Sequence, residues 1–294
     1  MNMIRTPDIY TEHFGLAQRP FSLVPDPEFL FWSPAHRGAF AMLQYGLMTR
    51  APITLLTGEI GAGKTTLVHH FLATLDEDVT VGLIANARPD STDVLRWVLP
   101  SLSVDVPRDA DEAERFDRFQ SFLIDEYGAG RRVVLVIDEA QNLSRAALEE
   151  LRMLTNINTN KDELLQLVLV GQPELRDRVR APDLIQFAQR VAANYHVPAM
   201  DGETVLRYIA HRLRVAGGKP GMFSRQAAEE VFRASGGVPR LVNQLCDLAM
   251  TYAFANGTAQ VRRATVRQVL DDGAFFAAGR HGPTPTTPSE GPAQ

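Results

Sequence analysis

The feature that most constrains this chain is a glycine-rich segment that fits the pattern G-x-x-x-x-G-K-[ST]. It reads Gly58-Glu59-Ile60-Gly61-Ala62-Gly63-Lys64-Thr65, and Thr66 follows it. An apolar run, 53–57, enters the segment and an amphipathic run, 65–72, leaves it, which is the pattern of a strand, a loop and a helix. Such a loop points backbone N–H groups and the positive end of a helix at a phosphate. We therefore predict that the segment and Thr66 bind nucleotide phosphates, with Lys64 on the β/γ oxygens and the Thr65 hydroxyl on Mg²⁺.

Lysine is rare in this chain, which makes its place in the motif informative. Only Lys64, Lys161 and Lys219 are lysines, and the other 27 of the 30 basic residues are arginines. A chance match that needs lysine at one fixed position is correspondingly rare.

Two carboxylates follow an apolar run at 133–137 and read Asp138-Glu139. A phosphate-binding loop of this kind works with a carboxylate at the end of a buried strand, which holds the metal ion. The position predicts that Asp138 binds Mg²⁺, through water, and that Glu139 polarises the attacking water. A glutamate beside the aspartate is typical of the class that carries its own general base and hydrolyses ATP.

Apolar runs alternate with amphipathic runs through the first two thirds of the chain. The strand-like runs are 53–57, 79–85, 133–137, 165–170 and 195–197. Continuous apolar runs between helices are typical of a parallel sheet covered on both faces. The pattern therefore predicts an α/β three-layer sandwich with five parallel strands. Its first helix would begin at Ser33-Pro34 and run to about Arg50.

The remaining segments predict three further parts. Residues 1–32, rich in Pro, Phe and Asp, are expected to form an extended segment packed on the nucleotide-binding domain, which spans 33–200. Helical patterns at 202–216, 224–235, 238–256 and 264–278 predict a small all-helical domain over 201–279. The tail 280–294, rich in Pro, Gly, Thr and Ser, is expected to be disordered.

Composition excludes several classes of protein. A net charge of −5 gives no global basic excess for nucleic acid. The single cysteine, Cys246, excludes an internal disulfide and is expected in the core, and the scattered histidines show no zinc spacing. No run approaches the roughly 18 apolar residues of a membrane span, and the N-terminus lacks a signal-peptide pattern. We expect a cytoplasmic protein with no direct membrane insertion.

Beyond these motifs, the chain up to about residue 279 resembles the AAA+ ATPases of the ExeA/GspA type, whose relatives include the transposition-regulator ATPases TnsC, TniB and MuB. The segments that carry the resemblance are Tyr10 to Leu16, Pro20-Phe21, Pro25 to Leu30, Leu56 to Thr66, Val170 to Leu175, Glu203-Thr204, Tyr208 to Leu213 and Gly237 to Asp247. The resemblance implies an AAA+ fold in which the helical domain is a lid over the nucleotide.

The resemblance also implies roles for single residues. Gln172 matches the sensor-1 position, which places the attacking water; its other reading is an amide that caps a turn. Arg190 matches the arginine finger, which reaches the γ-phosphate held by a neighbouring subunit; its other reading is a surface arginine. Arg240 matches sensor 2, which reaches from the lid onto the nucleotide. Asn86 is either a switch that restrains Glu139 or a turn asparagine.

A finger that acts in trans implies a homo-oligomer, either a ring such as a hexamer or a helical array. The resemblance implies an ATPase linked to secretion or the cell envelope that acts on a protein client. Full-length ExeA proteins continue beyond the lid with a transmembrane helix and a peptidoglycan-binding domain, and neither pattern occurs in these 294 residues. The alternative is an ATPase that assembles on duplex DNA, with Lys161 and the pair Arg131-Arg132 as candidate phosphate contacts.

Overall fold

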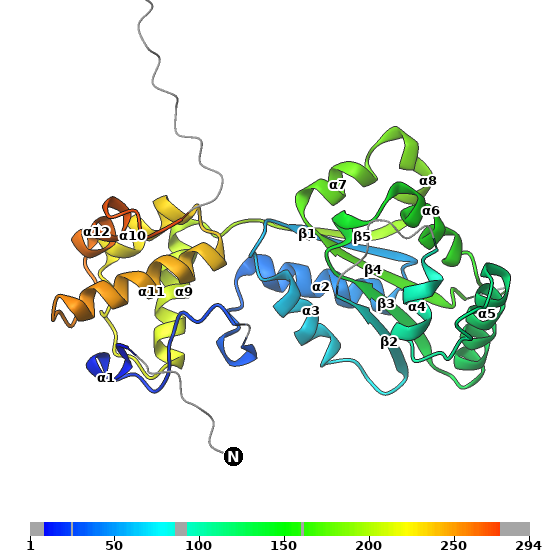
Figure 1. Cartoon of the computed structure of the whole chain (residues 1–294), viewed down its shortest axis with the longest axis horizontal. Helices are drawn as coiled ribbons and strands as arrows, with labels where there is room; N and C mark the ends of the chain where they lie inside the picture. Colours follow the sequence, from blue (N-terminus) through cyan, green and yellow to red (C-terminus); the bar gives the residue numbers. More distant parts are fainter. Residues whose placement is uncertain (1–8, 25, 86–92, 160–161, 277–294) are drawn as a thin grey trace, which may run out of the picture.

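Five parallel strands form the sheet at the centre of the larger domain, as the computed structural model shows (Figure 1). The structure describes residues 9–24, 26–85, 93–159 and 162–276. The strands are β1 (Ile53–Gly58), β2 (Val79–Ile84), β3 (Arg132–Ile137), β4 (Leu165–Gly171) and β5 (Val191–Val197). Their order is β2-β3-β4-β1-β5, so β1, which leads into the glycine-rich loop, lies inside the sheet. Its register pairs Leu55 with Leu169 on one side and with Asn194 on the other.

Helices connect the strands and cover both faces of the sheet. The helices of this domain are α2 (Pro34–Met48), α3 (Lys64–Leu72), α4 (Leu95–Ser101), α5 (Glu112–Gly128), α6 (Arg145–Leu154), α7 (Pro173–Val179) and α8 (Ile185–Ala188), with 3-10 turns η2 (Ala140–Asn142) and η3 (Pro182–Leu184). Alternate residues of a strand point to opposite faces. Leu135 therefore packs with α4, α5 and α6, whereas Val134 and Val136 pack with α2 and α3. The predicted three-layer α/β sandwich is confirmed.

A second, all-helical core follows the last strand. Its helices are α9 (Gly202–Val215), α10 (Arg225–Ser235), α11 (Pro239–Ala255) and α12 (Arg263–Asp271). Their apolar faces meet around fully buried side chains that include Val231, Leu245 and Cys246. Cys246 is thus a core residue, and burial raises the pKa of its thiol. Figure 1 shows this domain at the opposite end of the molecule from α5.

The N-terminal segment departs from the sequence prediction. We expected it to be extended and to pack on the nucleotide-binding domain, but it contains the short turns α1 (Thr11–Phe14) and η1 (Pro27–Phe29). Its aromatic side chains Tyr10, Phe14, Phe21 and Phe29 are buried in the core of the helical domain. The Tyr10 hydroxyl donates a hydrogen bond to Asp247 of α11. Burial of large aromatic rings against α9 and α11 is the physical reason for this placement.

Two element boundaries also differ from those predicted. Strand β5 begins at Val191, four residues before the predicted run, because the edge strand pairs with β1 along its whole length and its less apolar residues are half-exposed or exposed. Helix α12 ends at Asp271 rather than 278, because Gly273 adopts a positive φ of 66° and the Ala274 N–H bonds the Val269 carbonyl. The predicted tail, 280–294, lies outside the described residues.

Candidate functional site

The glycine-rich loop lies where β1 ends and α3 begins. Gly61 and Gly63 adopt positive φ of 76° and 88°, so the chain can turn back and start α3 with its free N–H groups facing the loop. Lys64, 9% exposed, donates hydrogen bonds from Nζ to the carbonyls of Gly58 (2.7 Å) and Glu59 (2.9 Å). Burial lowers the pKa of Lys64, and the carboxylates of Glu139 and Asp138 oppose that shift.

Asp138 and Thr65 form an oxygen-rich pair beside this loop. Asp138 follows β3, and its Oδ2 accepts a hydrogen bond from the Thr65 hydroxyl at 2.7 Å. Its Oδ1 accepts from the backbone N–H of Glu139 at 2.8 Å. A carboxylate and a hydroxyl are hard oxygen donors of the kind that Mg²⁺ prefers. The pair therefore fits the metal that the motif implies.

Glu139 is held by two glutamine side chains. Its backbone is left-handed, with φ 53°, which ends the extended conformation of β3. Its Oε2 accepts hydrogen bonds from Gln141 Nε2 at 2.5 Å and, at the limiting distance of 3.5 Å, from Gln172 Nε2. Gln141 Oε1 in turn accepts from the Gln172 backbone N–H at 3.1 Å. The structure thus brings the predicted residues Glu139 and Gln172 together and adds Gln141, which sequence reasoning missed.

The helical domain reaches the loop through the start of α11. The backbone N–H of Arg240 donates to the Gly61 carbonyl at 3.3 Å. A Cβ at Gly61 would lie 2.5 Å from the Cβ of Arg240, so only glycine permits this approach. Arg240 therefore lies beside the glycine-rich loop, and its predicted role at the nucleotide stays a prediction.

A cavity of about 470 Å³ joins these groups, a size typical of small-ligand sites. Its walls come from three parts of the chain: the glycine-rich loop with Glu139 and Gln172, the helical domain with Tyr208, Arg212 and Arg240, and the N-terminal segment. The N-terminal contribution, residues 23–31 in part, was not predicted to be one wall of a shared cavity. Trp32, next to the N-terminal wall, packs against Phe40 of α2 and His70 of α3.

His36 of α2 contacts the glycine-rich loop, and it was not identified from the sequence. Its Nε2 lies 3.1 Å from the Ala62 carbonyl, and its Nδ1 lies 2.7 Å from the Ser33 hydroxyl. Because a carbonyl only accepts, Nε2 carries the proton. Burial lowers the pKa of His36, which favours the neutral ring that this pattern needs. The ring fixes the loop backbone just before Lys64.

Arg190 lies elsewhere in the same subunit. It precedes β5 at the end opposite Val197, which pairs with Gly58, so it is roughly 20 Å from the loop along the strand. It donates hydrogen bonds to the Thr155 carbonyl at 3.2 Å and to Asn156, and it lies 3.8 Å from Glu163. Asn86 and Lys161 fall outside the described residues.

Two negative findings concern the described ranges alone. No helix there combines the length and apolar composition needed to cross a bilayer. In the same part of the chain, no three His, Cys, Asp or Glu side chains gather into a metal-binding group.

Residues 47–179 match the model of the AAA domain family. General secretion pathway protein A of Aeromonas hydrophila is 40% identical over 253 residues, which are 86% of this chain and 46% of that protein. The chain thus spans about half of the length of this relative.

Two solved structures share the fold. Cdc6p from Pyrobaculum aerophilum has a TM-score of 0.66 at 17% identity, over 86% of this chain and 70% of that one. Drosophila ORC bound to DNA has a TM-score of 0.69 at 16% identity, over 93% and 69%. Residues 47–179 thus match the AAA domain family, and the chain is similar to general secretion pathway protein A and shares the fold of these two structures.

Proposed function

We propose that this chain binds Mg·ATP in the cavity between its two domains and hydrolyses it to ADP and phosphate. The observation that carries the proposal is the grouping of Lys64, the Thr65–Asp138 pair and Glu139 at one end of the sheet. Binding of a nucleotide phosphate alone requires only the glycine-rich loop. A glutamate that two amides hold beside the loop adds a candidate base.

Each residue has a distinct role in this proposal. Mg²⁺, when bound, neutralises charge on the phosphate oxygens, and Thr65 and Asp138 are the residues that would hold it. Lys64 adds a positive charge at the β- and γ-phosphates. Glu139 takes a proton from water as the water oxygen bonds to the γ-phosphorus and the bond to the β–γ bridging oxygen breaks. Gln172 orients that water, and Arg240 contacts the γ-phosphate from the helical domain.

Replacement of the base separates binding from hydrolysis. Glu139→Gln keeps the shape and a hydrogen-bonding oxygen but cannot accept the proton. We expect ATP affinity within a few-fold of wild type and a fall in phosphate release of about 10²- to 10⁴-fold. Fluorescent-nucleotide titration and a phosphate-release assay measure the two quantities.

Two further variants serve as a control for the base and as a test of the phosphate site. Glu174→Gln removes an exposed carboxylate of α7 near the same loop and should hydrolyse ATP normally. Lys64→Ala should lose nucleotide affinity. Wild-type turnover in Glu139→Gln would exclude Glu139 as the base, and normal affinity in Lys64→Ala would exclude the phosphate site.

We further propose that the active form is an oligomer that acts on a protein client linked to secretion or the envelope. The relationship to general secretion pathway protein A supports the class of client, and the position of Arg190, far from the loop of its own subunit, supports a role in a neighbour.

The duplex-DNA alternative loses one of its candidate contacts. Arg131 is paired with the mostly buried Glu126 at 2.5 Å, so its charge is already balanced. Arg132 lies 3.1 Å from the more exposed Asp78, and this pair holds it only weakly. ATPase rate and particle size, measured with and without duplex DNA, compare the two proposals. Turnover and assembly that ignore DNA support a protein client, whereas DNA-dependent filaments support the alternative.

A further inference from the structure

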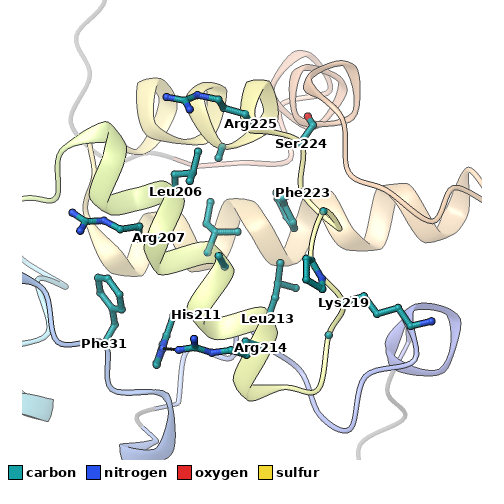
Figure 2. Close-up of a pocket in the computed structure, with 16 residues that line it drawn as sticks. Phe31, Leu206, Arg207, His211, Leu213, Arg214, Lys219, Phe223, Ser224 and Arg225 are labelled. Atoms are coloured by element: carbon teal, nitrogen blue, oxygen red, sulfur yellow. Dashed lines mark hydrogen bonds between the residues drawn. The ribbon is translucent and has the colours of Figure 1, made fainter.

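A second cavity lies in the helical domain, and among the described residues its lining shares only Phe31 with the lining of the cavity at the glycine-rich loop. It has a volume of about 740 Å³ and is formed by α9, the segment 218–224 and the start of α10 (Figure 2). Phe31 of the N-terminal segment closes one side. The volume is large enough to accept several side chains of a partner.

Its lining combines an apolar floor with a cationic rim. Leu206, Leu213 and Phe223 form part of the floor, and Figure 2 shows positively charged side chains around them. These cations are Arg207, Arg214, Lys219 and Arg225. None of the residues that line the cavity in the described structure is an Asp or a Glu. On a chain of net charge −5, this is a local positive patch.

The cations are only weakly engaged within the chain. Arg225 lies 3.7 Å from Glu203 and 3.4 Å from Glu229, and all three side chains are exposed, so these pairs contribute little. Arg214 donates to the neutral ring nitrogen Nδ1 of His211 at 3.2 Å. A ligand carboxylate would therefore find cations that do not have to break strong ion pairs.

Phe31 separates this cavity from the nucleotide cavity, because it lines both. Its ring centroid lies 5.7 Å from that of Tyr208, on the nucleotide side, and 5.4 Å from that of His211, on the other side. A side chain that enters either cavity therefore contacts the same aromatic wall.

We propose that the second cavity binds an acidic segment of the protein client through a bulky apolar side chain, and that Phe31 couples this binding to the nucleotide. An acidic amphipathic peptide can pack apolar side chains on the floor and pair its carboxylates with the cations of the rim. A nucleic-acid backbone would use the cations and leave the apolar floor exposed. The proposal rests on the proposed function for the protein client and for the coupling step, whereas the docking itself needs no nucleotide.

The docking test uses a set of fluorescent 12-residue peptides in which acidic content and Phe/Leu content vary independently. Without nucleotide, we expect binding only when both are present. Arg207→Glu and Lys219→Glu should each weaken it about tenfold. Arg262→Glu reverses an exposed arginine that is not part of the lining and should leave affinity unchanged.

Other results of this test overturn the proposal. Peptide binding that ignores acidic content or the rim variants would exclude this occupant. So would competition by a short DNA duplex that depends on Arg207 and Lys219, which would assign the rim to nucleic acid. Rim variants that alter particle size without altering peptide affinity would assign the cavity to a second copy of the chain.

The coupling test measures the ATP affinity of Glu139→Gln with and without the best peptide. We expect a change of about fivefold, and the same factor for the effect of ATP on peptide affinity, because coupling is reciprocal. Phe31→Leu should still bind the peptide but lose most of the coupling. Peptide binding with no effect on ATP would refute the coupling while leaving ATP hydrolysis, assayed separately, untouched.

Discussion

Glu150 on α6 is a half-buried carboxyl group whose pKa rises from 4.5 to about 6, mainly because of burial and also because of Asp93 and Glu112. Its Oε1 accepts a hydrogen bond from the Val94 N–H at 3.0 Å. Since the folded state has the higher pKa, the stability gained from the protonated form is complete below about pH 4.5 and is lost as the pH rises through 6.

Glu150→Gln therefore should raise the free energy of unfolding at pH 7.5 and leave it nearly unchanged at pH 4. The amide keeps an acceptor for Val94 and does not titrate. Urea unfolding at the two pH values measures the difference. Glu149→Gln, which removes the carboxylate paired with Arg152 at 2.9 Å, is the control and should not stabilise. Equal effects of Glu150→Gln at both pH values would contradict the role of burial.

At the residue scale, the sequence predicted those groups whose role depends on a local pattern. Lys64 and Asp138 stand at fixed places in a loop and at a strand end, so their neighbours identify them. Gln141 and His36 act through Gln172 and Ala62, residues 31 and 26 positions away. A lone glutamine or histidine has no spacing that marks such a contact, and only the fold reveals it.

The start of α11 depends on a close approach at Gly237. This residue has φ 78°, and a Cβ on it would lie 1.9 Å from the Met200 carbonyl oxygen. Its own carbonyl accepts a hydrogen bond from Met200 N–H at 3.0 Å. The contact fixes where α11 begins and therefore where Arg240 meets the loop.

Gly237→Ala should lower the melting temperature and raise the KM for ATP. Gly257→Ala is a matched control, because Gly257 has a similar φ of 65° but no heavy atom within 4 Å of the added Cβ. The control should cost only the backbone strain, about 1 kcal/mol, and leave KM unchanged. If both variants behave alike, the contact with Met200 does not position the helix.

At the element scale, periodic apolar runs predicted the strands and helices well, since burial on one or two faces dictates the pattern. The placement of the N-terminal segment was wrong for a physical reason. Aromatic residues such as Phe14 and Phe21 show that a segment will be buried but carry no information on which core accepts them.

At the scale of the whole molecule, a mixture of two inactive variants tests whether Arg190 acts on the site of a neighbouring subunit. Arg190→Ala keeps the loop and Glu139, whereas Glu139→Gln keeps Arg190. Each alone should be nearly inactive. An equal mixture should regain about a quarter of wild-type activity, because random assembly places an intact site against an intact finger at about one junction in four.

The ATPase rate of such mixtures, at several ratios, is the measurement. Arg190→Lys controls for the loss of contacts to Thr155 and Asn156, since lysine keeps a donor there. A mixture no more active than the mean of its components would show that Arg190 does not act between subunits.

The helical domain is attached to the sheet domain by two lengths of chain. Residues 198–201 join β5 to α9, and residues 30–32 join the buried Phe29 to Ser33, which caps α2. Each connection is a short loop, so any rotation of the helical domain against the sheet domain must bend both loops. We expect such a rotation to follow the line between the two loops. Phe31, which lines both cavities, lies within one of these loops.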